Sequence, residues 1–207
     1  AYPALGDGTY HNGWLNAEDV APPAYTPPED TGKGNGASLA PKAETRNGTA
    51  TASVDVSDMD KAVENAKKNK SDVVTVAPEI TGTTSEASVQ LPKSSVSDMA
   101  AGTDADLKVE TPVGDVTIPN QALNSVADSA EGSDVVVNIA KKSVSDVDDK
   151  NIDTSSGIVI SVTITSGGKQ ITSFGGESIT IDIPVEGDYT VGESYNVVQI
   201  SGDGSQQ

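Results

Sequence analysis

The segment from Gly157 to Pro184 contains two runs in which apolar and polar side chains strictly alternate. Positions 158, 160, 162 and 164 hold Ile or Val, and isoleucine recurs at positions 179, 181 and 183. Such alternation of β-branched residues is typical of strands that bury one face, and the Gly-Gly pairs at 167–168 and 175–176 predict turns. We therefore expect two antiparallel strands here, with Ile181 in the hydrophobic core and another layer covering their apolar face.

The apolar residues of the whole chain also favour sheets. The sequence has 24 Val and 12 Ile but only 6 Leu, and β-branched residues suit strands better than helix bundles. The fold is therefore predicted to be mainly β.

The charge balance excludes several partners. The chain has 13 basic against 31 acidic residues and a formal net charge of -18, whereas a phosphate-binding surface needs clustered Lys and Arg. We therefore expect no nucleic-acid partner.

No apolar run approaches the ~18 residues of a membrane span, and no basic-then-apolar signal segment opens the chain, so we expect no membrane insertion. The absence of cysteine excludes a disulfide scaffold and a thiolate zinc site.

Residues 1–46 differ in composition from residues 47–207. They contain six of the eleven prolines, the only Trp and the only His, with little periodicity, and the Pro-Pro pairs favour an extended linker. A solvated tail is one interpretation. The alternative is a docking arm, because a chain so poor in aromatic residues places four of them here: Tyr2, Tyr10, Trp14 and Tyr25.

Between the arm and the Gly157–Pro184 segment, alternating periodicities predict strands and short helices. Residues 58–69 are predicted to form a helix that begins with a capping box at Ser57 and Asp60. Its periodicity places Met59, Ala62, Val63 and Ala66 on one face. Further helices are expected at 94–101 and from Asn120, and strands at 49–56, 72–76, 86–91, 107–118 (a hairpin) and 135–139. The predicted fold is an antiparallel β-sandwich with about three short marginal helices, preceded by the extended arm.

Several short motifs occur in an order that resembles a known module: Leu91-Pro92-Lys93, residues 109–114, residues 118–123, and residues 171–176 leading to 179–184. The chain from about 49 to 200 resembles the β-rich module of large cell-surface proteins of Gram-positive, clostridia-like bacteria, often found beside S-layer homology repeats. It is also weakly similar to GAIN-type domains. The resemblance implies an extracellular, secreted location and no catalytic residue. Such modules usually continue with a further hairpin that this sequence lacks, so we expect an unpaired sheet edge here.

No catalytic constellation is recognisable. His11 lies in the arm without a Ser or Cys partner that the sequence can place beside it, so a catalytic triad is not supported, and we expect no enzyme activity.

The densest acidic cluster contains Asp146, Asp148, Asp149, Asn151 and Asp153. Thr154 replaces the turn glycine of a calcium loop, and Ile160 replaces its terminal glutamate. A solvated loop is expected, with an irregular Ca²⁺ site as the alternative; no other cofactor is predicted.

These observations predict a non-catalytic structural or assembly module of a bacterial cell-surface protein, whose partners are other surface-protein domains or copies of itself. Two alternatives stay open. One is a carbohydrate- or cell-wall-binding module, which normally presents aromatic platforms. The other is the protomer of a self-assembled extracellular filament that docks through residues 1–25.

Overall fold

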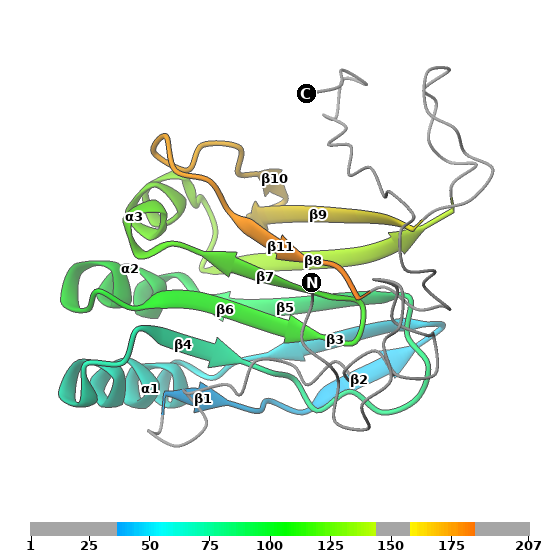
Figure 1. The fold of residues 1–207 in the computed structure, drawn as a ribbon, viewed down its shortest axis with the longest axis horizontal. Helices are drawn as coiled ribbons and strands as arrows, with labels where there is room; N and C mark the ends of the chain where they lie inside the picture. The colour runs from blue at the N-terminus through cyan, green and yellow to red at the C-terminus, as the bar shows by residue number, and fades with distance from the viewer. Residues whose placement is uncertain (1–36, 144–157, 185–207) are drawn as a thin grey trace, which may run out of the picture. The chain divides into compact units, whose positions relative to one another are not determined.

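In the computed structural model, residues 37–143 and 158–184 are described, and they form a mainly β body with eleven strands and three helices (Figure 1). The strands are β1 (Ser38–Leu39), β2 (Ala43–Arg46), β3 (Thr49–Ser53), β4 (Val73–Val76), β5 (Glu86–Pro92), β6 (Asp106–Thr111), β7 (Gly114–Ile118), β8 (Asp134–Lys142), β9 (Val159–Ser166), β10 (Lys169–Gln170) and β11 (Thr180–Asp182). The helices are α1 (Val56–Asn69), α2 (Lys93–Gly102) and α3 (Asn120–Ser129). None of these helices is long and apolar enough to cross a membrane.

The strands form two mixed sheets rather than the purely antiparallel pair that the sequence predicted. One sheet has the order β1-β4-β6-β7-β11 and the other β10-β9-β8-β5-β3-β2. The pairs β1/β4, β4/β6 and β3/β5 are parallel. The helical connections explain this difference. Strands β3 and β5 each lead into a helix at the same end of the body, and β4 and β6 each leave one, so the members of each pair run in the same direction (Figure 1).

The three helices lie side by side at one end of both sheets and connect them (Figure 1). Helix α1 buries the face predicted from its periodicity, with Met59, Ala62, Val63 and Ala66. The predicted capping box is wrong, because Asp55 is the N-cap residue and no side chain caps the helix. Ser57 instead lies in the first turn. Asp60 accepts a hydrogen bond from Ser95 Oγ at 2.6 Å, which joins α1 to α2.

One hydrophobic core lies between the sheets and extends under the helices. Its largest fully buried side chains come from all three helices and both sheets. Met59, Met99 and Leu123 anchor α1, α2 and α3 in this order. Truncation of such a side chain to alanine typically costs about 2–5 kcal/mol, so the core fixes the positions of the sheets and helices together.

The two alternating runs at 158–164 and 179–183 form strands, but not with each other. Strand β9 pairs with β8 and β10, whereas β11 pairs with β7 in the other sheet. Ile181 is opposite the fully buried Val116 and therefore points toward the core side, yet it is 40% exposed. The prediction of a buried Ile181 is thus wrong, because no described strand lies beyond β11 to cover it.

Part of the predicted arm belongs to the sheets. Strand β1 pairs with β4, and β2 pairs with β3, although both lie before the boundary predicted near residue 46. Both strands are short, and only Leu39 among their residues is a large apolar side chain. They therefore carry little of the periodicity by which a strand is recognised in a sequence.

Candidate functional site

The β6–β7 hairpin presents a cluster of charged side chains on the outer face of the five-stranded sheet. Alternation turns Leu107 and Val109 into the core and leaves Lys108 and Glu110 on the opposite face. Asp115 is directly opposite Glu110 in the register of the two strands and shares that face. The hairpin therefore brings one cation and two carboxylates together.

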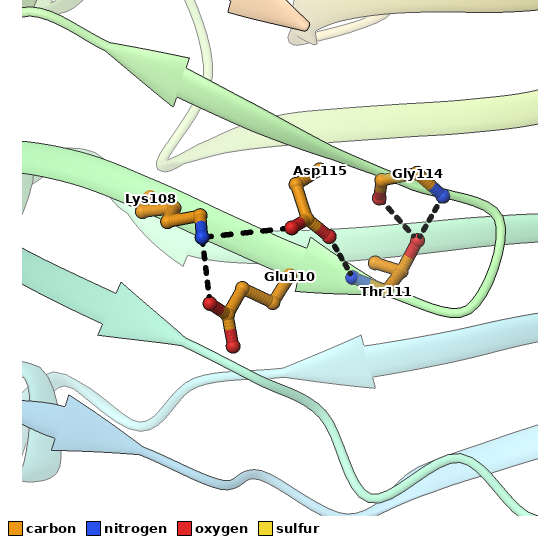
Figure 2. Close-up of polar contacts among 5 residues, drawn as sticks. All are labelled: Lys108, Glu110, Thr111, Gly114 and Asp115. Carbon is orange, nitrogen blue, oxygen red and sulfur yellow. Dashed lines mark hydrogen bonds and ion pairs between the residues drawn. The ribbon is translucent and has the colours of Figure 1, made fainter. Parts of the chain in front are cut away.

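Lys108 lies between the two carboxylates (Figure 2). Its Nζ is 2.8 Å from Glu110 Oε1 and 3.5 Å from Asp115 Oδ2. The side chains of Lys108, Glu110 and Asp115 are only 20%, 22% and 26% exposed. Partly buried pairs are screened less by salt than pairs on an open surface, so the interactions within this cluster depend less on ionic strength than those of the exposed ion pairs elsewhere on the body.

Thr111 connects the charges to the turn. Its backbone amide donates to Asp115 Oδ1 at 3.1 Å, and its hydroxyl donates to the Gly114 carbonyl at 2.7 Å (Figure 2). The same hydroxyl oxygen accepts hydrogen bonds from the amides of Val113 and Gly114. Both carboxylate oxygens of Asp115 therefore have a partner, and the turn backbone is held by a single side chain.

The cluster has one negative charge more than it has positive charge, and the pKa values reflect this. Burial of the Asp115 carboxyl raises its pKa above the ordinary 3.8, and the nearby Glu110 charge adds to this effect. The Thr111 amide and Lys108 partly oppose it. Burial lowers the pKa of Lys108, but Glu110 and Asp115 more than compensate, so the pKa of Lys108 is raised above 10.5.

The geometry of the cluster joins strands rather than opening to a ligand. Lys108 Nζ, Glu110 Oε1 and both carboxylate oxygens of Asp115 already have partners within the hairpin. Two surface hollows of about 200 and 220 Å³ lie elsewhere on the described part of the chain, and both are below the ~300–1,000 Å³ of typical ligand pockets.

A second polar network crosses three strands on the other sheet. Glu86 accepts from the Asn138 side-chain amide at 2.7 Å and from the Thr49 hydroxyl at 3.3 Å. These residues belong to β5, β8 and β3. Neither network was identified from the sequence. The sequence did contain a pattern that could have identified the Lys108 cluster. Lys108 and Glu110 are two residues apart on a predicted strand, and Asp115 lies on the strand that returns after the two-residue turn.

The predicted site residues lie outside the described residues. This applies to the calcium candidates Asp146, Asp148, Asp149, Asn151 and Asp153, to the docking candidates Tyr2, Tyr10, Trp14 and Tyr25, and to His11. Among residues 37–143 and 158–184, no group of three or more His, Cys, Asp or Glu side chains is placed to hold a metal ion.

Replacing Asp115 with asparagine is expected to flatten part of the pH dependence of stability. Because the folded-state pKa of Asp115 is raised, its proton stabilises the fold below pH 3.8, and this contribution is lost as the pH rises through the folded value. The asparagine side chain would stay neutral and still accept from the Thr111 amide. Above that window we expect Asp115→Asn to match or exceed the wild type, by less than about 1 kcal/mol. Urea unfolding at pH 3.5 and 7 measures the difference, and a variant less stable by the same amount at both pH values would contradict this assignment.

Replacing Lys108 with methionine is expected to destabilise the body by about 1–2 kcal/mol at pH 7, since two partly buried carboxylates would then face each other unpaired. The deficit should shrink in acid, where the carboxylates protonate. Lys61→Met is the matched control, because Lys61 pairs with Asp58 at 2.9 Å but is 70% exposed, and it should cost under about 0.5 kcal/mol. Equal losses for the two variants in urea unfolding would show that the hairpin cluster has no special role.

No family model matches the chain, and no curated protein or solved structure matches it.

Proposed function

We propose that this chain is a non-catalytic structural module of a bacterial cell-surface protein. The Lys108 cluster is the observation that supports it best, because its three partly buried charged side chains join β6 to β7 and interact with the turn between them. The other polar networks act in the same way. The Asn120 side chain, for example, donates to the Ala105 carbonyl at 3.2 Å, which ties the start of α3 to the segment before β6.

The chemistry of the surface supports a structural role better than sugar binding. Carbohydrate-binding modules normally present exposed aromatic rings as platforms. Within residues 37–143 and 158–184 the single aromatic side chain is Phe174, which packs against the core and is only partly exposed. The surface location is part of the proposal and accords with the acidic, cysteine-free composition.

A glycan array combined with sedimentation on purified cell walls tests the absence of a ligand. We expect the purified chain to bind neither, because a structural module contacts other protein domains. Surface biotinylation of intact cells of the source bacterium tests the location, and the chain should be labelled before lysis. Saturable binding to a defined glycan would replace the structural role with a binding role, and labelling only after lysis would remove the surface location.

A further inference from the structure

Strand β9 leaves most of its length unpaired on one side. It pairs with β8 from Val159 to Thr165, whereas β10 pairs only with Thr165 and Ser166 on the other side. The amide of Ile171 adds a hydrogen bond to the Ile164 carbonyl at 2.7 Å. Within the described part of the chain, no strand therefore pairs with residues 159–163 on that side.

Strand β9 lacks the usual features that protect an edge strand from pairing with another chain. Natural edge strands are commonly protected by charges, prolines, bulges or very short length. Strand β9 has eight residues and contains neither a charged residue nor a proline. It therefore presents a regular row of backbone donors and acceptors to another strand.

Apolar side chains are exposed at the same side of the two-sheet body. Strands β9 and β11 both lie at the side opposite β1 and β2 (Figure 1). Ile181 is 40% exposed and Ile183 is 37% exposed, and Ile160 and Val162 of β9 pack against the core but are only partly buried. We call the β9 backbone at 159–163, together with these four side chains, the open edge.

We propose that the open edge binds the N-terminal segment of a second copy of this chain by strand addition, so that copies join head to tail. This inference rests on the proposed structural role and supplies its partner. In strand addition, backbone hydrogen bonds provide affinity and alternate side chains fill apolar positions. The open edge offers both kinds of contact.

The sequence of the N-terminal segment suits this role. Residues 4–21 contain no proline, so none of them lacks the backbone amide that strand pairing requires. Tyr10 and Trp14 are four residues apart and would lie on one face of an added strand, about 13 Å apart at 3.3 Å per residue. Large aromatic side chains bury much apolar area, so they would shield the exposed isoleucines of the open edge from water.

The charges are complementary as well. Five acidic residues and no Lys or Arg precede Lys33. On the body, the exposed Lys142 lies at the end of β8, opposite Val159 of the open edge. In a chain with an excess of acidic residues, this lysine makes one end of the edge attractive to an acidic strand.

The arrangement is head to tail, because the donor and the acceptor are different parts of each copy. The donor segment precedes β1, whereas the acceptor consists of β9 together with Ile181 and Ile183. Contacts between two different surfaces of identical copies do not close after one pair and generate an open chain of subunits.

A mixing experiment with the full chain tests this arrangement. The donor variant is Tyr10→Ser/Trp14→Ser, and the acceptor variant is Ile181→Lys, at a position exposed enough to tolerate the change. We expect the wild type to form a ladder of oligomers in sizing as its concentration rises, and each variant alone to remain monomeric. An equimolar mixture of the two should give dimers and no larger species, because only one intact donor and one intact acceptor remain per pair.

Trp14 is the only tryptophan and gives a second measurement. Its emission should shift to shorter wavelength in the wild-type oligomer and in the mixture, but not in the Ile181→Lys variant alone. Ser53→Lys, on an exposed position of β3 far from β9 in the sheet order, is the matched control and should assemble like the wild type.

Several outcomes would overturn the proposal. One is a wild-type chain that stays monomeric at all concentrations with unshifted Trp14 emission, as expected if residues 185–207 cover the edge of their own chain. Another is a donor variant that still forms the oligomer ladder. Binding in the glycan array would remove the proposed structural role and leave the sizing result standing, so the two failures can be told apart.

Discussion

Ile139→Asp is expected to abolish cooperative folding of the body. Ile139 is fully buried on β8, between Ala87 of β5 and Val162 of β9. An aspartate there would place a charge without a partner between the two sheets, at a cost on the order of 4 kcal/mol or more. That cost is comparable to the entire stability of many small domains. Circular dichroism during thermal unfolding should show a transition that is lost or moved far below that of the wild type.

Two further variants make this test selective. Ile139→Val removes one methylene from the same site and should cost about 1 kcal/mol. Ile181→Asp carries the same charge to a residue that is 40% exposed and should cost less than about 1 kcal/mol, because the carboxylate reaches water. If Ile181→Asp unfolds the body as completely as Ile139→Asp, then β11 is covered in solution and the open edge does not exist.

Ile139 and Ile181 also show which structural properties the alternating sequence pattern can predict. Alternation correctly predicted strands at both places, and the register places Ile181 opposite the buried Val116, on the core-facing side that was predicted for it. It did not predict the difference in burial, because burial depends on what lies beyond the strand in the sheet. Which strand or segment lies beyond it is determined by long-range topology, and the local alternation of apolar and polar residues carries no information about that topology.

The parallel pairs have a similar origin. Each helix was predicted near its observed position, and the inner face of α1 was confirmed. The sequence did not show that β3 and β4, although consecutive around α1, lie in different sheets. The parallel direction of β3 and β5 follows from that choice. The predicted antiparallel sandwich was therefore correct in its mainly β character and only partly correct in its strand directions, because three strand pairs are parallel.

The candidate site was predictable only in part. The hairpin at 107–118 was predicted, and its alternation places Lys108, Glu110 and Asp115 on one face. Their mutual distances depend on the register, which is fixed by the two-residue turn at Pro112 and Val113 and by the hydrogen bonds of Thr111. The Glu86 network could not be predicted from the sequence, because Thr49 and Asn138 are 37 and 52 residues away from Glu86.

Gly132→Ala is expected to destabilise the body by about 1–3 kcal/mol, because the new methyl group would clash with the backbone of Gly167. A Cβ at Gly132 would lie 2.7 Å from the amide nitrogen and 3.0 Å from the Cα of Gly167, in the turn between β9 and β10. Neither atom belongs to a flexible side chain, so the turn itself must move. The Gly132 amide also donates to Ser166 Oγ at 2.9 Å, and that hydroxyl donates to the Asp134 carbonyl at 2.7 Å.

The consequence should be local to the strand that forms the open edge. Ser166 is 1% exposed, so displacing the turn would leave a buried hydroxyl poorly paired and would loosen the end of β9. Hydrogen exchange of the β9 amides should accelerate, while exchange in α1 changes little beyond the global loss of stability. Gly102→Ala is the control. A Cβ at Gly102 would meet nothing closer than Lys67 Nζ at 3.9 Å, and alanine at the end of α2 should be neutral or stabilising by up to about 1 kcal/mol. Opposite signs for the two variants in urea unfolding would establish the contact between Gly132 and Gly167, whereas equal small effects would show that the β9–β10 turn is not held there.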